Sequence, residues 1–160
     1  MMMHNWFTCK IRYEKTMENG MNKKVTEPYL VDALSFTEAE SRIIEEMTPF
    51  FQGEFVVAGV ARANYEEIFP SDEECADRWY KCKLWFMTLD EKTGVEKRTA
   101  SNVLVQASDL RDAIRKLDEG MKDTLADYVI ASVSETAIMD VYPYEADPDV
   151  KPEFNDADRR

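Results

Sequence analysis

The chain has 160 residues and little of the chemistry on which most enzymes depend. Its single histidine, His4, lies near the N-terminal end, which excludes a catalytic triad or a two-histidine metal site inside the fold. The five glycines form neither of the loops that bind phosphates or dinucleotides. The cysteines, Cys9, Cys75 and Cys82, are odd in number and include no CxxC pair, which indicates reduced thiols. The sequence therefore predicts a protein that is not an enzyme and holds no metal or cofactor.

Long apolar runs are also missing. No stretch approaches the ~18 apolar residues of a membrane-spanning helix, and residues 1–5 lack the basic and apolar regions of a signal peptide. We therefore expect a cytoplasmic protein with no membrane partner. Hydrophobic residues make up 44% of the chain, which is enough to build the core of one folded domain.

The most specific positive feature is an internal repeat. The stretch that begins at Trp6 returns 73 positions later at Trp79, with aromatic, cysteine and lysine residues in the same places. Gly20 matches Gly94 at an offset of 74. Further matches join 30–33 to 104–107 and 68–70 to 141–143. Agreement at so many landmarks indicates a tandem duplication.

Both copies predict the same series of strands. Apolar residues alternate along 5–15, which is the period of a half-buried strand. Asn19-Gly20 and Thr93-Gly94 are typical of hairpin turns. Pro28, in the second strand, is typical of an edge position. Third strands are expected at 54–63 and 127–136, followed by short apolar segments at 65–69 and 137–142.

One helix is expected in each copy. Ser35 and Glu38 form a capping box, and Ser108 and Asp109 are best explained as cap residues of the second helix. The apolar residues that follow lie on one helical stripe, at the same spacing in both copies. These residues are Phe36, Ala39, Ile43 and Met47, and then Leu110, Ala113, Leu117 and Met121.

The predicted fold is α+β: a tandem duplication of a β-β-α-β unit that forms one pseudo-twofold domain, with an antiparallel sheet covered by two helices. The domain is expected at 1–144, with repeat one at about 5–70 and repeat two at about 78–143. Residues 145–160 are rich in acids and turn-forming residues, so we expect a flexible acidic tail.

The charge follows the repeat. With 32 acids and 20 bases the net charge is −12, which alone disfavours a nucleic-acid partner. However, 11 of the 20 bases lie in two stretches, 10–24 and 78–98, each with a net charge of +3. These stretches are the two predicted hairpins, so the bases are concentrated at equivalent places.

Strand alternation adds aromatic residues to these bases. The residues opposite the expected core face alternate between tryptophan and lysine or arginine, a combination that single-stranded nucleic acids use for stacking and phosphate pairing. We therefore expect a ligand-binding face that engages single-stranded nucleic acid or a nucleotide. Its residues are Trp6, Lys10, Arg12, Trp79, Lys81, Lys83 and Trp85.

Several alternatives stay open. The tryptophans also suit a buried contact between the repeats, with lysines at its rim, or a homodimer contact. Cys9 and Cys82 suit core positions, and Cys75 suits an exposed thiol. A protein-interaction module is the second function considered, in which acidic side chains imitate the phosphates of nucleic acid. A metal held by Glu66-Glu67 and Asp140 is the weakest alternative, because this spacing is not a known motif.

The chain also resembles a known family. The residues that carry the resemblance are 5–10, 24–33 and 131–140, and it extends over about 5–144. The family is classified only as a domain of unknown function, found in gut Bacteroidetes and their phages. The resemblance implies a cytosolic bacterial or phage protein, but no activity, cofactor or catalytic residue. If the protein is the protein-interaction module considered above, a phage-encoded inhibitor of a host defence system is one example.

Overall fold

The computed structural model describes residues 5–144, so His4 and the tail expected at 145–160 lie outside the described residues. The strands and helices predicted from the sequence are confirmed. The first half contains β1 (Trp6–Thr16), β2 (Asn22–Asp32), α1 (Phe36–Met47), a 3-10 helix (Thr48–Phe50), β3 (Phe55–Ala63) and β4 (Glu67–Phe69). The second half contains β5 (Arg78–Leu89), β6 (Glu96–Ala107), α2 (Leu110–Gly120), β7 (Tyr128–Glu135) and β8 (Val141–Tyr142).

The α+β class is confirmed, but the prediction of a single antiparallel sheet is wrong. The strands form two four-stranded sheets, in the orders β3-β1-β2-β8 and β4-β6-β5-β7. Most neighbours are antiparallel, whereas β8 pairs in parallel with β2 and β4 in parallel with β6. Alternation in the sequence shows that a strand has a buried face, but it does not show whether two sheets join edge to edge or stack.

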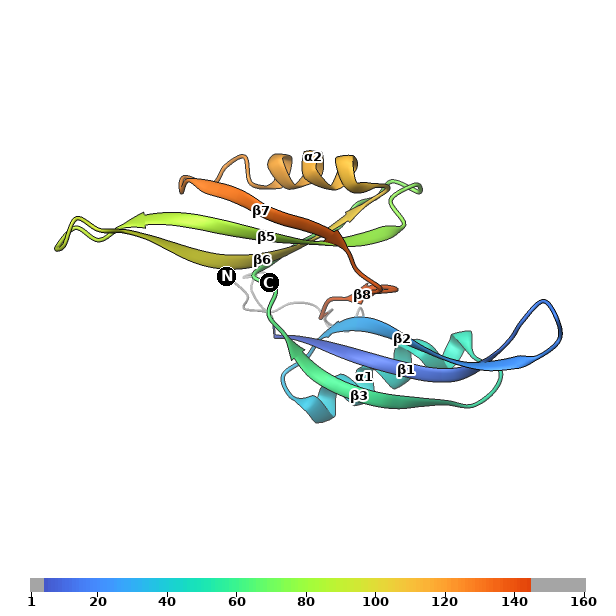
Figure 1. Ribbon diagram of the computed structural model, residues 1–160. Helices are drawn as coiled ribbons and strands as arrows, with labels where there is room; N and C mark the ends of the chain where they lie inside the picture. Colours follow the sequence, from blue (N-terminus) through green and yellow to red (C-terminus); the bar gives the residue numbers. More distant parts are fainter. Residues whose placement is uncertain (1–4, 145–160) are drawn as a thin grey trace, which may run out of the picture.

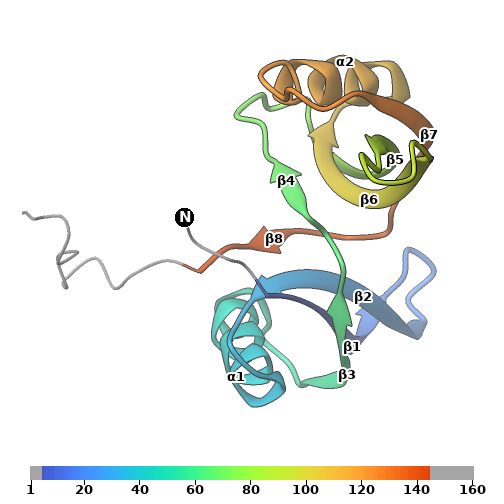
Figure 2. The same ribbon diagram turned by 90° about the vertical axis from the view of Figure 1, so that its left-hand side faces the viewer.

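The two sheets lie in the middle of the molecule and the helices lie outside. Figures 1 and 2 show α2 on the outer side of one sheet and α1 on the outer side of the other. Each helix therefore covers one sheet rather than sharing a common one. The opposite faces of the two sheets are turned toward each other, so residues that alternate away from the helix are directed toward the other half.

The hairpins extend beyond the region where the sheets overlap. Gly20 and Gly94 have positive φ angles of 84° and 71°, a conformation that glycine adopts without a steric penalty, so each turn forms where the sequence predicts it. The β1–β2 and β5–β6 hairpins point in opposite directions (Figure 1). Pro28 lies in the part of β2 that β8 does not pair, since β8 contacts only Leu30 and Val31 in the ladder.

The helices begin at the predicted caps. Ser35 Oγ accepts a hydrogen bond from the Glu38 N–H at 3.1 Å, and Asp109 accepts one from the Asp112 N–H at 2.8 Å. Most of each apolar stripe is buried against its own sheet: Ala39, Ile43 and Met47 in α1, and Ala113, Leu117 and the adjoining Met121 in α2. Phe36 and Leu110, at the first helical position, are 48% exposed and belong to the buried stripe only in part.

Each sheet has its own core on the helix side. In the first half Phe7, Cys9 and Ile11 of β1 pack with Val31 and the α1 stripe. In the second half the buried side chains lie on β5, β6 and α2 and around its end, and they are Cys82, Leu84, Val103, Val105, Leu117 and Met121. Fully burying a large apolar side chain stabilises the fold by about 1.5–3 kcal/mol, so each half holds its helix in place mainly through these contacts.

The short strands β4 and β8 are exchanged between the halves. β4 follows the first helix in the chain but pairs with β6, and β8 follows the second helix but pairs with β2. Hydrogen bonds extend both pairings: the Leu30 N–H donates to the Asp140 carbonyl at 3.0 Å, and the Glu66 N–H donates to the Asn102 carbonyl at 2.8 Å. Each sheet is therefore completed by the other half of the chain.

The second residue after each exchanged strand is anchored in the same way. The Ser71 N–H donates to Gln106 Oε1 at 2.9 Å, and the Tyr144 N–H donates to Asp32 Oδ2 at 3.4 Å. Gln106 and Asp32 lie at or next to the ends of β6 and β2. These bonds fix the points at which the crossing segments leave the opposite sheet.

A small apolar cluster joins the halves. Trp6 and Leu30 of the first sheet pack with Trp79 and Leu104 of the second, and all four are buried. Ile68 of β4 and Val141 of β8 pack against this cluster. The exchanged strands and the contact between the sheets therefore share one core.

The outer edge strands β3 and β7 carry few charges. Arg62 is the one charged residue in β3, and Glu135 is the one in β7. Uncharged edges invite pairing with other chains, and a β-bulge is one device that prevents it. The register shifts leave Ala58 in β3 and Ala131 in β7 without a partner, so each edge is interrupted by a bulge.

Candidate functional site

Two of the three tryptophans predicted to bind ligand are buried. Trp6 is 6% exposed and Trp79 is 4% exposed, because both fill the apolar cluster between the sheets. A side chain with so little free surface does not stack on a nucleic-acid base while the fold is intact. Their burial therefore argues against the stacking role predicted for Trp6 and Trp79, and both side chains fill a contact between the two halves instead.

The predicted binding residues are also divided between two surfaces. Lys10 and Arg12 are exposed on β1, and Lys81 is exposed on β5 with the half-buried Lys83. Because the two hairpins point in opposite directions (Figure 1), they do not form one continuous platform. The structure therefore separates a first-hairpin surface from a second-hairpin surface.

Trp85 differs from the other tryptophans. It lies on β5, is half-buried and does not belong to the apolar cluster between the sheets. Lys83 Nζ lies 4.7 Å from the centroid of its ring and Arg98 Cζ lies 4.9 Å from it. Cations at this distance from an indole are attracted to its ring electrons. Trp85 thus gathers two positive charges around one aromatic side chain.

The cations of this group have no carboxylate partner within residues 5–144. The ion pairs in this range involve Arg78, Arg115 and Lys116, which bind acids near α2 or at the start of β5. Lys81, Lys83 and Arg98 are in none of them. Bases on one strand face that have no described carboxylate partner favour a positive local potential, despite the 32 acids of the chain. We call Lys81, Lys83, Trp85 and Arg98 the Trp85 patch.

Arg98 is not among the ligand-binding residues predicted from the sequence. It lies on β6, where it pairs with Met87, two residues beyond Trp85 on β5. Opposite residues of an antiparallel pair share a face, and residues two apart on one strand share it too. Counting the pairing outward from the turn at Gly94 therefore places Arg98 beside Trp85, and this was the signal available in the sequence.

The surface of the first hairpin has a different character. A groove of about 610 Å³ lies there, and its charged lining residues are Arg12, Glu14, Lys24 and Glu54. Acids and bases alternate in it, so it has no uniform potential. Arg12 also occupies the position that corresponds to Trp85 at the offset of 73, so this surface has no matching tryptophan.

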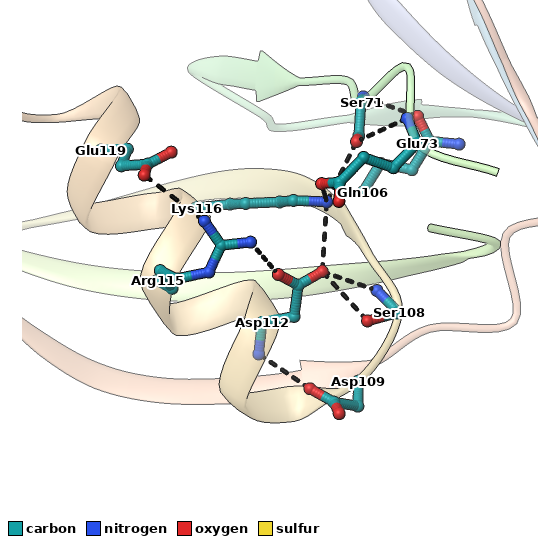
Figure 3. Close-up of polar contacts among 9 residues, drawn as sticks. All are labelled: Ser71, Glu73, Gln106, Ser108, Asp109, Asp112, Arg115, Lys116 and Glu119. Atoms are coloured by element: carbon teal, nitrogen blue, oxygen red, sulfur yellow. Dashed lines mark hydrogen bonds and ion pairs between the residues drawn. The ribbon is translucent and has the colours of Figure 1, made fainter. Parts of the chain in front are cut away.

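The densest polar cluster of the described chain lies at the start of α2 (Figure 3). Asp112 accepts hydrogen bonds from the Ser108 N–H at 3.0 Å and from Lys116 at 3.1 Å. Lys116 also contacts Glu73 at 2.7 Å and Ser71 at 3.0 Å. The bond from the Ser108 backbone, followed by those from Lys116 and Arg115, holds the pKa of Asp112 far below its ordinary value.

This cluster is explained by structure. It completes the cap of α2 and ties the connector between the halves to the helix, so its charges are satisfied by one another (Figure 3). No side chain in it is left to bind a substrate, and we assign it no ligand.

The thiols are of two kinds, as predicted. Cys9 and Cys82 are fully buried in the two cores, and burial raises the pKa of each to about 11. Cys75 is exposed in the connector. At neutral pH the two core thiols are protonated and poor nucleophiles.

The carboxylates that sequence analysis considered for a metal do line one cavity. Glu66, Glu67 and Asp140 lie around a space of about 300 Å³ where the halves meet. However, no group of three or more His, Cys, Asp or Glu side chains within the described range is arranged to hold a metal ion.

A comparison with protein families shows the family to which this chain belongs. A model described as a domain of unknown function, DUF4494, matches residues 5–144, which are also the residues that the structure describes. The chain belongs to this family. The comparison with curated proteins finds no match. Among the described helices, none is long and apolar enough to cross a membrane.

Proposed function

We propose that this protein binds a nucleotide or a short stretch of single-stranded nucleic acid at the Trp85 patch. One observation carries the proposal: two cations converge on a half-buried indole, and neither has a carboxylate partner in residues 5–144. Aromatic rings among unpaired cations are what single-strand binding proteins offer to bases and phosphates.

Each residue of the patch has a separate role in the proposal. Lys83 and Arg98 pair with a phosphate, which also relieves the repulsion between their own charges at Trp85. Lys81, farther along the same strand, pairs with a neighbouring phosphate. Trp85 provides the ring on which a base stacks once the phosphate has drawn the two cations aside. The role is binding without catalysis, in the cytoplasm of a bacterial or phage-infected cell.

We infer further that the two halves descend from a tandem duplication and are related by a pseudo-twofold axis. The sequence matches at offsets of 73 and 74 support this, and so do the corresponding strand orders and the reciprocal exchange of β4 and β8. In this view Trp85 and Arg12 are equivalent positions, of which one has acquired the stacking residue.

The alternative is a protein-interaction module such as a phage-encoded inhibitor of a host defence system. The observation that favours it is the acidic balance of the chain, with exposed Glu40 and Glu45 on α1 and Asp118 and Glu119 on α2. In that case the outer helix faces would bind a basic partner. Changes to the Trp85 patch would then leave the interaction intact.

The test is an equilibrium titration of a fluorescently labelled oligothymidylate of about eight nucleotides. Loss of one stacking contact costs about 1–3 kcal/mol, so Trp85→Ala is expected to weaken binding about fivefold or more. A Lys83→Gln/Arg98→Gln variant is expected to weaken it comparably.

The matched control is Lys10→Gln/Arg12→Gln. It removes the same charge from the first hairpin, and it is expected to change the affinity less than about twofold, because charges on another surface are screened. Equal losses in both double variants would show that binding depends on overall charge, and unchanged binding by Trp85→Ala would overturn the proposal.

A further inference from the structure

A second candidate site lies where the two halves meet. The cavity of about 300 Å³ is walled by Trp6 and Trp79 and by the crossing segments around β4 and β8. Ligand cavities in proteins begin at about this size. It is separate from the Trp85 patch, because none of the patch residues lines it.

Most of the lining residues come in pairs, one from each copy. At the offset of 73, Trp6 corresponds to Trp79 and Glu67 corresponds to Asp140. The same offset relates Ile68 to Val141 and Pro70 to Pro143, and all of these residues line the cavity. Similar side chains therefore face the cavity from both halves, with a carboxylate from each.

The cavity is negatively charged and partly apolar. Among residues 5–144, its ionisable lining residues are Glu66, Glu67 and Asp140, and no base of this range lines it. These carboxylates form no ion pair within the described part of the chain. Asp140 Oδ1 accepts a hydrogen bond from the Val141 N–H at 2.8 Å, which fixes its position.

The arrangement of the carboxylates indicates which kind of cation suits the cavity. A metal ion needs ligands that converge on one point, and the side chains of residues 5–144 provide no such group. Carboxylates spread around indole and aliphatic surface suit a larger cation with carbon atoms between its charges.

We propose that this cavity binds a small organic ammonium ion of the diamine class. The two ammonium groups pair with Glu67 and Asp140, one from each half, and the carbon chain lies against the tryptophan and proline surfaces. Binding at this place contacts both halves at once, so the ligand stabilises their association.

The test uses putrescine as the probe and tryptophan fluorescence as the signal. In a Trp85→Phe variant the remaining tryptophans are Trp6 and Trp79, which both line the cavity. A saturable change in their emission is expected with putrescine at constant ionic strength. The uncharged diol with the same carbon chain is expected to give none.

A charge-matched pair of variants locates the site. In the Trp85→Phe background, Glu67→Gln/Asp140→Asn is expected to weaken putrescine binding about tenfold, because both ammonium partners are lost. Glu40→Gln/Glu45→Gln removes the same charge from the exposed face of α1 and is expected to change the affinity less than about twofold.

Three results would overturn the proposal: no saturable response, an equal response to the diol, or equal losses in both double variants. The outcome is independent of nucleotide binding. Trp85→Phe alters the Trp85 patch but leaves the cavity, and Glu67→Gln/Asp140→Asn does the reverse.

Discussion

At the scale of single residues, the three tryptophans differ in the side chains that surround them, and these surroundings determine the role of each. Trp6 and Trp79 are covered by the opposite sheet and hold the halves together. Trp85 lies farther along β5, beyond this contact, and its neighbours are Lys83 and Arg98. The same kind of side chain is thus buried in a core at one end of a strand face and half-buried among cations farther along it.

Asp112 gives the clearest prediction for a single residue. Its pKa is lowered in the folded protein, first by the hydrogen bond from the Ser108 backbone, so its ionised form stabilises the fold. This contribution is complete above the ordinary pKa of about 3.9 and is lost as the pH falls below it. Asp112→Asn is therefore expected to lower Tm at neutral pH, with a difference from the wild type that shrinks in acid.

Thermal unfolding at about pH 7 and about pH 3 measures this difference. Asp123→Asn is the control, because Asp123 is exposed in the turn after α2 and the same charge is removed there. A Tm difference for Asp112→Asn that is equally large at both pH values would contradict the explanation. The cap would then act through shape rather than through the ionised carboxylate.

At the scale of elements, the exchange of β4 and β8 determines how the sheets are completed. β8 has two residues, and a strand this short is held by its surroundings rather than by its own ladder. Val141 packs against the cluster of Trp6, Leu30, Trp79 and Leu104, while the neighbouring Asp140 carbonyl accepts the bond from the Leu30 N–H. Packing and pairing therefore depend on each other here.

Val141→Asp is expected to detach β8 from the first sheet. A carboxylate placed against an apolar cluster is costly unless it moves to water, and the Leu30 N–H then loses its acceptor. Native-state hydrogen exchange should show faster exchange at the Leu30 amide. Val129→Asp is the control, since Val129 is 56% exposed on β7. Unchanged protection of Leu30 in Val141→Asp would contradict the role given to β8.

Most of the turns, helix starts and strands are predictable from the sequence because each is determined by local signals. Gly20 and Gly94 mark the turns, Ser35 and Asp109 mark the helix starts, and alternation marks the strands. The stacking of two sheets is not local. A residue such as Trp6 has the same alternation whether its outward face meets water or another sheet, so the burial of this face depends on tertiary contacts that the pattern does not encode.

The candidate site was predictable in part for the same reason. Trp85, Lys81 and Lys83 follow from the alternation of one strand, and they share the surface that the structure describes. Arg98 required the register of a strand pair, which depends on the turn. Glu67 and Asp140 were grouped from the sequence as possible metal ligands, but the cavity that they line depends on the exchange of strands between the halves, which no local signal in the sequence indicates.

At the scale of the whole molecule, the local charge differs from one surface to another. The ion pairs of residues 5–144 involve Arg78, Arg115 and Lys116, near α2 and the start of β5, whereas Lys81, Lys83 and Arg98 take part in none of them. The net charge of −12 therefore does not describe what a ligand meets at the Trp85 patch. The proposed anionic ligand would bind at this surface, whereas the proposed ligand of the cavity between the halves is a cation.

The salt dependence of binding tests the central claim most directly. Each phosphate neutralised on a single strand contributes a slope of about −0.7 in a plot of log affinity against log salt. Contacts from Lys81, Lys83 and Arg98 therefore predict a slope of about −2 for the oligothymidylate between about 50 and about 200 mM salt. Lys83→Gln/Arg98→Gln is expected to reduce the slope to about −0.7. A slope near zero, or a slope that this variant leaves unchanged, would contradict nucleic-acid binding at the Trp85 patch.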